Sequence, residues 1–363
     1  MKLEHRIGQL LVIGLPGPQL DLMTRSLLQT IQPGGILLNK HNIESAQQLA
    51  ELTATIRSLL EVPPIIAIDQ EGGRVDRLKQ IYTPMPSADL LRSSGDAAIA
   101  GRMGEIAAEA LRTLGFNVNF APVLDIANDD GSNNGLKGRY LGSSLAEVVR
   151  LGGSYLEGLQ HGGIIGVGKH FPGLGAAVID SHEELPRIDR SRDEILKEDA
   201  APYTELFSKI NARLNAVIIA HAHYPAFDGP SPLPSSLSKN IVTTLLREEF
   251  SFKGLTMTDD LEMGAITATR ELGDAAVMAI EAGIDMVMVA DSSSPERATS
   301  AWEAMIKAAE QGRITKTHIG RAFDHIARIK SMLSPPHAYS EQAVVRLRER
   351  IGELNLTLQH SGR

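Results

Sequence analysis

The feature that most constrains the fold is the alternation of short apolar runs with amphipathic segments along the whole chain. Eight runs have the length and composition of buried parallel strands, and they cover residues 10–15, 35–38, 65–69, 118–121, 164–169, 216–220, 255–259 and 286–290. Between the runs, apolar residues at helical spacing predict helices over residues 43–60, 97–114, 145–159, 192–210 and 239–250.

Eight strand–helix units in one chain predict an α/β protein, a single-domain (β/α)8 barrel of the TIM type. Such a barrel needs about 250 residues, and a chain of 363 residues has room for it and for insertions. A doubly wound open sheet is the alternative, but no Gly-x-Gly-x-x-Gly motif follows the first predicted strand. We expect the catalytic barrel to occupy residues 1–335. A charged helix over 341–354 would lie in a C-terminal extension, residues 336–363, that packs outside the barrel or mediates self-association.

Composition narrows the class of partner. The formal net charge of -8 argues against nucleic acid and anionic membranes as partners. The absence of cysteine excludes disulfides and thiolate metal sites. No apolar run is long enough to span a membrane, and the N-terminal segment lacks the pattern of a signal peptide. We therefore predict a cytoplasmic protein, expected to be monomeric, that acts on a small molecule.

Polar side chains collect where the predicted strands end. Lys169-His170-Phe171-Pro172-Gly173 follows one apolar run, and its glycine and proline predict a loop instead of a continuing strand. A single aspartate after a strand is usually the N-cap of the next helix. Several polar groups at the carboxyl end of one barrel indicate an active site, and those that follow other strands are Asp69, Glu71, Arg77, Asp125, His221, His223 and Asp259.

Two of these segments offer carboxylates for catalysis. Asp259 and Asp260 are neighbours, and because neighbours on a strand point to opposite faces, one belongs to the site while the other caps or pairs. An ionised carboxylate beside Arg77, Arg139 or Lys169 would suit a nucleophile.

The Asp180-Ser181-His182 loop offers a base. Asp180 could orient the imidazole of His182 as a general acid/base. An exposed loop with an Asx-turn is the purely structural alternative.

Three further residues have competing interpretations. His221 and His223 alternate along a strand, so both could bind a metal, or they could be a supporting histidine and a loop residue. Glu71 is the main alternative to His182 as the general acid. It precedes two glycines, however, and we expect its side chain to brace that turn.

Together these segments resemble glycoside hydrolase family 3, and within it the bacterial cytoplasmic β-N-acetylglucosaminidases. The Lys-His-Phe-Pro-Gly block with Asp-Ser-His downstream is typical of that branch. The β-glucosidase branch takes its acid/base carboxylate from a second domain. The matching segments span most of the chain and cover residues 68–77, 119–125, 138–139, 169–173, 180–182 and 257–261.

The resemblance implies a retaining, exo-acting and metal-free enzyme without a cofactor. It would release N-acetylglucosamine from small glycans or muropeptides during peptidoglycan recycling. Asp259 matches the nucleophile, and His182 matches the acid/base with Asp180 as its partner. Gly173-Leu174-Gly175 departs from the usual Gly-His-Gly, at a position outside the catalytic pair. The residues that match those holding the terminal sugar are Asp69, Arg77, Arg139, Lys169 and His170.

Two alternatives stay open at this point. The first is a metal-dependent hydrolase on the same barrel that uses His170, His221 and His223. Activity that survives chelation would exclude it. The second is a non-catalytic saccharide-binding protein that retains the pocket, which turnover of a chromogenic β-N-acetylglucosaminide would exclude.

Overall fold

The computed structural model describes residues 1–128, 133–290 and 294–361. Its centre is one parallel sheet with the strand order β7-β6-β3-β2-β1-β11-β10-β9-β8. The strands are almost entirely buried, which explains why each one is a nearly continuous apolar run. Their bounds are β1 (Leu11–Gly14), β2 (Gly35–Leu37), β3 (Ile65–Ile68), β6 (Val118–Asn119), β7 (Ile165–Gly166), β8 (Gly168–Phe171), β9 (Ala216–Ile219), β10 (Leu255–Asp260) and β11 (Met286–Val289).

The two ends of this sheet are consecutive in the chain. Only Val167 separates β7 from β8, and its N–H donates to the carbonyls of Asn119 (3.0 Å) and Ala121 (2.9 Å). β7 and β8 are therefore two parts of one barrel strand, and the nine labelled strands correspond to the eight predicted ones. The sheet is a nearly closed parallel barrel, and the predicted (β/α)8 fold is confirmed.

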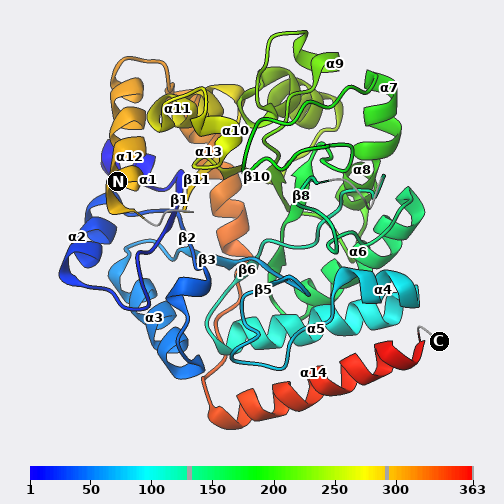
Figure 1. Ribbon diagram of the computed structural model, residues 1–363. Helices are drawn as coiled ribbons and strands as arrows, with labels where there is room; N and C mark the ends of the chain where they lie inside the picture. Colours follow the sequence, from blue (N-terminus) through cyan, green and yellow to red (C-terminus); the bar gives the residue numbers. More distant parts are fainter. Residues whose placement is uncertain (129–132, 291–293, 362–363) are drawn as a thin grey trace.

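Helices surround the barrel (Figure 1). The five predicted helices are found as α3, α5, α6, the α7–α8 segment and the π-helical η4. The main helices are α1 (Leu3–Gly8), α2 (Leu22–Ile31), α3 (Ala46–Leu59), α4 (Ala88–Ser94), α5 (Ala97–Thr113), α6 (Leu145–His161), α8 (Ala201–Ser208), η4 (Asn240–Glu249), α10 (Gly264–Thr267), α11 (Leu272–Ala282), α12 (Pro295–Glu310), α13 (Lys316–Ser331) and α14 (Glu341–Ser361). The short helical turns are η1 (Lys40–Asn42), α7 (Arg192–Glu194), η2 (Ile195–Asp199), α9 (Pro225–Asp228) and η3 (Ser235–Leu237).

Two local expectations are wrong. β8 continues through Phe171, so His170 and Phe171 belong to a strand and not to the loop predicted after residue 169. The reason is that neighbouring strands still pair there, because Ala220 N–H donates to Phe171 O (2.8 Å) and Leu124 N–H to Lys169 O (2.7 Å). The second case is the helix predicted over 192–210, which is interrupted by the π-helical turn η2 and ends at Ser208.

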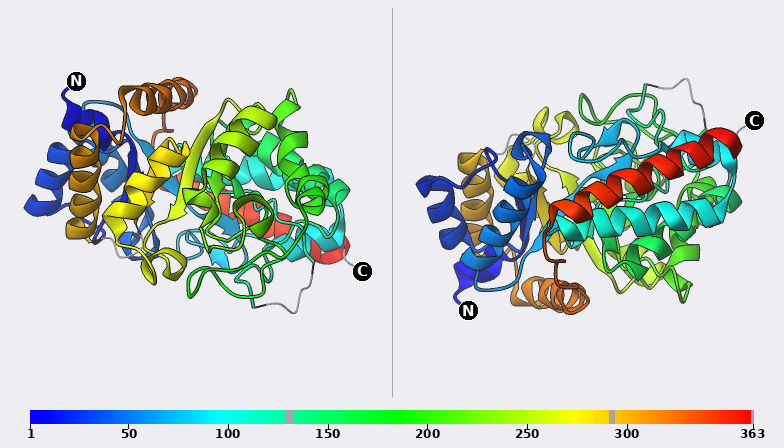
Figure 2. Two further views of the ribbon diagram at one scale, coloured as in Figure 1. Left: turned by 90° about the horizontal axis from the view of Figure 1, so that it is seen from above. Right: turned by 90° about the horizontal axis from the view of Figure 1, so that it is seen from below.

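The last helix, α14, lies along α5 on the outside of the barrel (Figure 2, right). It is longer than the predicted 341–354. One apolar face is buried, and it consists of Val344, Leu347, Ile351, Leu354 and Leu358. Over the described ranges, no helix combines the length and the apolarity that crossing a bilayer requires.

A small hairpin positions part of the site. β4 (Gln70–Gly72) and β5 (Val75–Asp76) pair in antiparallel fashion just beyond the end of β3. The Gln70 amide is buried and donates to Asp76 Oδ1 (2.8 Å), while its oxygen accepts the N–H of Arg77 (3.0 Å). The hairpin is thereby held over the mouth of the barrel.

Candidate active site

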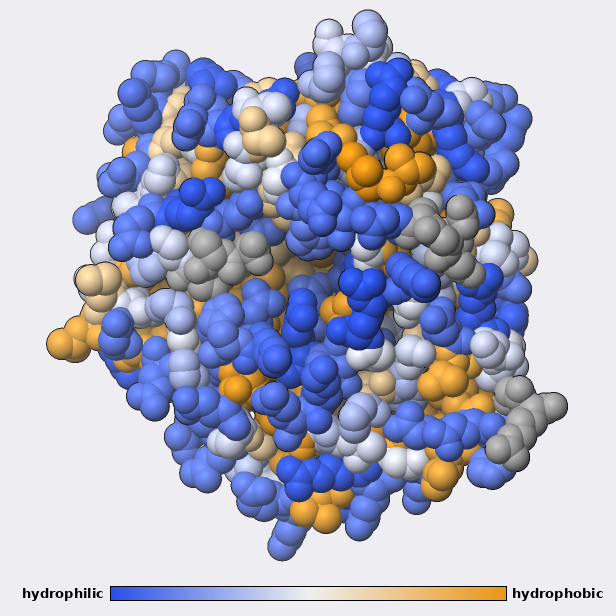
Figure 3. All heavy atoms as spheres, in the orientation of Figure 1, coloured by the Kyte–Doolittle hydropathy of each residue, from blue (hydrophilic) through white to orange (hydrophobic). Residues whose placement is uncertain are grey.

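A pocket of about 290 Å³ opens at the carboxyl ends of the barrel strands. Hydrophilic side chains surround this central hollow (Figure 3). The structure brings together all eight site residues that the sequence predicts, and these are Asp69, Arg77, Arg139, Lys169, His170, Asp180, His182 and Asp259.

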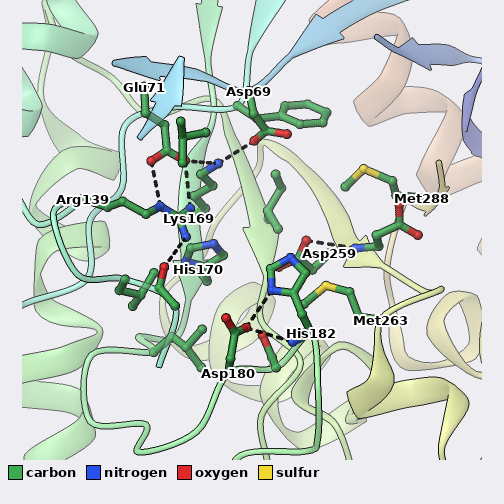
Figure 4. Close-up of a pocket in the computed structure, with 18 of the residues that line it drawn as sticks. Asp69, Glu71, Arg139, Lys169, His170, Asp180, His182, Asp259, Met263 and Met288 are labelled. Carbon is green, nitrogen blue, oxygen red and sulfur yellow. Dashed lines mark hydrogen bonds and ion pairs between the residues drawn. The ribbon is translucent and has the colours of Figure 1, made fainter. Parts of the chain in front are cut away.

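One wall of the pocket is a cluster of four charged groups (Figure 4). Lys169 Nζ lies 2.6 Å from Asp69 Oδ1 and 2.6 Å from Glu71 Oε1. Arg139 binds Glu71 in a bidentate pair, with both Nε–Oε2 and Nη2–Oε1 at 2.8 Å. Such forked, charge-assisted bonds fix both partners in orientation. The wall is therefore a rigid set of hydrogen-bonding groups.

Electrostatics keep Glu71 and Lys169 ionised. Burial alone would raise the pKa of Glu71, but the charges of Arg139 and Lys169 hold that pKa well below its ordinary value. Burial alone would lower the pKa of Lys169, but Asp69 and Glu71 raise it. Glu71 is thus a fixed anion and unsuited to donate a proton.

The expectation that Glu71 braces its own turn is wrong. Its carboxylate instead binds Arg139 and Lys169, which come from distant parts of the chain. Sequence reasoning missed this role because it depends on which strand ends are neighbours. The signal available was the position of Glu71 two residues after Asp69, at the end of a strand.

His170 is held by a second carboxylate that sequence reasoning left without a role. Asp125 is fully buried, and its Oδ2 lies 2.7 Å from His170 Nδ1. It also accepts the backbone N–H groups of His170 (3.2 Å) and Leu174 (2.6 Å). Because a carboxylate only accepts, Nδ1 carries the proton, and Nε2 is left for the pocket. A register shift between β8 and β9 accompanies the placement of Lys169 and His170 on the same wall.

The predicted Asp180–His182 pair is formed. His182 Nδ1 lies 2.6 Å from Asp180 Oδ1, and Figure 4 shows the ring between Asp180 and Asp259. The same oxygen accepts the backbone N–H of His182 (2.9 Å), so the Asx-turn named as the alternative is present as well. Burial would raise the pKa of Asp180, but the two bonds from His182 lower it. The His182 side chain is 65% exposed, and solvent reaches it directly.

Asp259 and Asp260 divide as strand alternation predicts. Asp260 is buried and accepts the backbone N–H groups of Ala290 and Glu262, each at 3.0 Å. Burial raises the pKa of Asp260 well above its ordinary value. Both residues border the pocket, but the two Asp260 oxygens are occupied by these backbone N–H groups.

Asp259 is the carboxylate suited to attack. Burial alone would raise its pKa, but nearby imidazoles outweigh that effect and lower it. The imidazoles, in order of decreasing effect, are those of His170, His221 and His182. An ionised carboxylate therefore faces the pocket at neutral pH.

The histidines proposed as metal ligands have other contacts, although His223 Nε2 is buried without a hydrogen-bond partner among the described residues. His221 lies within hydrogen-bond distance of Ser236 Oγ through Nδ1 (2.8 Å) and of Asp260 O through Nε2 (3.0 Å). His223 Nδ1 faces the backbone of Leu233. Within residues 1–128, 133–290 and 294–361, no three His, Asp or Glu side chains are grouped as metal ligands would be. In that part of the chain, His170, His221 and His223 are not brought together as one ligand set.

Arg77 has spare hydrogen-bonding capacity. It lines the pocket, and its Nε is buried without a hydrogen-bond partner among the residues that the structure describes. A buried donor of this kind is costly to leave unpaired, and a ligand oxygen in the pocket would satisfy it.

Taken with the charged cluster, the pocket offers an ionised carboxylate, a solvent-accessible imidazole and fixed groups for hydroxyls. Those parts match what glycoside hydrolysis requires.

Comparisons with known proteins identify the family of the chain. Residues 2–329 match the glycosyl hydrolase family 3 N-terminal domain. A β-hexosaminidase of Alkalilimnicola ehrlichii is 36% identical over 77% of this chain and 80% of its own length. One from Nitrosomonas eutropha is 32% identical over 95% of this chain and 97% of its own length.

Solved structures show the same similarity. A family 3 β-N-acetylglucosaminidase from a Paenibacillus species superposes with a TM-score of 0.89 at 34% identity, covering 98% of this chain and 69% of that one. The chain belongs to glycoside hydrolase family 3, as a β-N-acetylhexosaminidase.

Proposed function

We propose that the protein is a retaining exo-β-N-acetylglucosaminidase that acts on muropeptide-type glycans through a covalent glycosyl-Asp259 intermediate. The observation that carries the proposal is that one pocket holds both the ionised Asp259 and the exposed Asp180–His182 pair. A retaining glycosidase needs a carboxylate at the anomeric carbon and a proton donor at the leaving oxygen.

In the first step, an Asp259 oxygen forms a bond to the anomeric carbon as the bond to the leaving oxygen breaks. His182 Nε2 donates its proton to that oxygen. Asp180 binds Nδ1, so the transferable proton is on Nε2, and the aspartate stabilises the ring while it is charged.

In the second step, water attacks the anomeric carbon and the ester to Asp259 breaks. His182 Nε2 takes the proton of the water and returns to its starting state. Exposure of the imidazole suits this step because water must reach the base.

The charged cluster would hold the terminal sugar. Asp69 and Lys169 offer an acceptor and a donor for neighbouring hydroxyls, and Arg77 offers its unpaired Nε. Binding of a hydroxyl that chain extension would occupy makes the site exo-acting. Asp69→Ala should lower kcat/KM by a factor that corresponds to about 1–3 kcal/mol, while Glu71 still pairs with Lys169 and keeps the variant folded.

The muropeptide substrate and a role in cytoplasmic peptidoglycan recycling rest on the resemblance to that enzyme branch. The β-hexosaminidase relatives support the sugar class. Release of N-acetylglucosamine from a muropeptide, measured beside release from chitobiose, tests the finer assignment. A large preference for chitobiose would contradict it.

Covalent trapping tests the mechanism. A slowly hydrolysed fluorinated N-acetylglucosaminide should label the protein, and peptide mapping should find the label on Asp259. Labelling of Asp260 or Glu71 would refute the assignment. Turnover without any label would favour attack by the substrate's own acetamido group. Equal kcat/KM for matched β-N-acetylglucosaminide and β-glucoside, or prompt cleavage inside a long glycan, would refute the proposed specificity.

A further inference from the structure

The loop that carries Asp180 and His182 contacts a neighbouring turn, residues 133–139, which we call the rim turn. Asn133 pairs with Ile179 in an isolated parallel bridge, one residue before Asp180. Asn134 is buried, and its side chain fixes the turn from inside. Its contacts are Tyr140 Oη (2.8 Å), Gly175 O (3.4 Å) and the N–H of Leu136 (3.0 Å). The rim turn is thus attached to the same loop that carries Asp180 and His182.

Gly135, in the middle of the rim turn, faces the Asp180 carboxylate directly. Its φ is +76°, in the left-handed region that favours glycine. A Cβ at this position would lie 2.4 Å from Asp180 Oδ2, 2.8 Å from Cγ and 3.1 Å from Oδ1. Those are the three nearest atoms in the described part of the chain, so a side chain at residue 135 would meet Asp180 first.

The Asp180 carboxylate is therefore fixed from two sides. Its Oδ1 accepts two bonds from His182, while Oδ2 occupies the space that the missing side chain of Gly135 leaves. The rim turn is in turn connected to the sugar-binding wall, because Arg139 Nη1 donates to Gly135 O (3.2 Å) and the same guanidinium binds Glu71.

We propose that Gly135 is a positioning residue for catalysis, because its lack of a side chain sets the place of the Asp180 carboxylate and hence of the His182 imidazole at the leaving oxygen. This inference rests on the proposed role of His182 as acid/base. Arg139 joins the position of the rim turn to the wall that binds the terminal sugar, so the acid/base and the sugar share one framework.

The test uses Gly135→Ala with Gly312→Ala as its matched control. Gly312 has a φ of +78°, and no heavy atom of a described residue lies within 4 Å of an added Cβ. Its alanine variant therefore reports backbone strain alone. Since an error of about 1 Å in a catalytic group can cost about 100-fold, Gly135→Ala should lower kcat about 10- to 100-fold for a disaccharide with a poor leaving group. KM should change little.

For an activated aryl glycoside, which needs little protonation, the loss should be about threefold or less. Gly312→Ala should leave both substrates unaffected.

Two further variants separate strain from displacement. Gly135→Asn adds a Cβ, but asparagine tolerates positive φ, so it should fold if the alanine variant does not, and show the same leaving-group pattern. In a double-mutant cycle, Gly135→Ala should cost no more in the Asp180→Ala background than Gly312→Ala costs in the natural protein, because the group that it displaces is gone.

Three results would overturn the inference. The first is a Gly135→Ala enzyme that matches Gly312→Ala on both substrates. The second is an equal loss on both substrates, which marks general damage to the fold. The third is additivity in the Asp180→Ala cycle. By contrast, a His182→Ala enzyme without leaving-group dependence would refute the acid/base assignment itself, and the role of Gly135 would fall with it.

Discussion

The pocket contains two histidine–aspartate pairs that are alike in chemistry and opposite in setting. His170 and Asp125 are joined by a 2.7 Å contact with side chains 7% and 0% exposed. His182 and Asp180 are joined by a 2.6 Å contact with side chains 65% and 24% exposed. The first histidine lies on strand β8, while the second lies on a loop (Figure 4).

Under the roles proposed for the two histidines, this difference in burial gives one motif two purposes. Asp125 also accepts two backbone N–H groups, so its histidine is held in one orientation and suits the fixed recognition of a hydroxyl. Asp180 holds a ring that water reaches, which proton exchange during turnover requires. Both imidazoles pair with an aspartate, and burial decides whether the imidazole suits a fixed contact or the transfer of a proton.

The largest expected effect distinguishes the two histidines by their response to the leaving group. His182→Ala should lose about 10²- to 10⁴-fold in kcat/KM on a poor leaving group and much less on an activated aryl glycoside. Azide should accelerate breakdown of the trapped intermediate. His170→Ala should lose similar factors on both substrates, because its proposed contact is with the sugar that they share. If both variants show the same profile, the division of roles fails.

The next effect concerns stability, measured as the free energy of unfolding in urea. Asp125→Ala should destabilise by about 3–5 kcal/mol, because it leaves a buried histidine and two N–H groups without their partner. Asp180→Ala should change stability by about 1 kcal/mol or less, since exposed pairs contribute little. Equal losses would show that the loop pair is as much a part of the core as the strand pair.

The smallest expected effect is the pH dependence of the stability that Glu71 contributes in the charged cluster. The pKa of Glu71 is lowered from its ordinary value of 4.5, so its ionisation stabilises the fold above pH 4.5 and that contribution is lost as the pH falls. Glu71→Gln should lower the free energy of unfolding by about 1–3 kcal/mol at pH 7. The difference in free energy of unfolding between Glu71→Gln and the natural protein should become smaller as the pH falls below 4.5. A gap that stays constant with pH would contradict the ionised pairing.

The sequence predicted the barrel well because parallel strands are buried on both faces and therefore stand out as apolar runs. It also separated Asp259 from Asp260, because alternation along a strand is a local property. The pairing of His170 with Asp125 and the binding of Glu71 to Arg139 could not be predicted in this way. Both depend on which strand ends meet, and sequence spacing does not contain that information.

Residues that usually end a strand gave a wrong boundary where hydrogen bonds to neighbouring strands continued the strand. Pro172 predicts an end to β8, yet ladder bonds continue through Phe171 because the proline, which lacks an N–H, comes only after the last of them. The contact of Gly135 with Asp180 is equally invisible in the sequence, where a glycine in a loop looks like an ordinary turn residue.

The wall formed by Asp69, Glu71, Lys169 and Arg139 contains two negative and two positive groups, so it is neutral as a unit inside a chain of net charge -8. A neutral sugar therefore meets dense hydrogen-bonding capacity without a net field that would draw in or repel counterions. Interactions this buried are screened little by salt. Affinity for an uncharged N-acetylglucosaminide should accordingly stay constant across a wide range of ionic strength, and the enzyme should recognise its sugar equally well in dilute and concentrated salt.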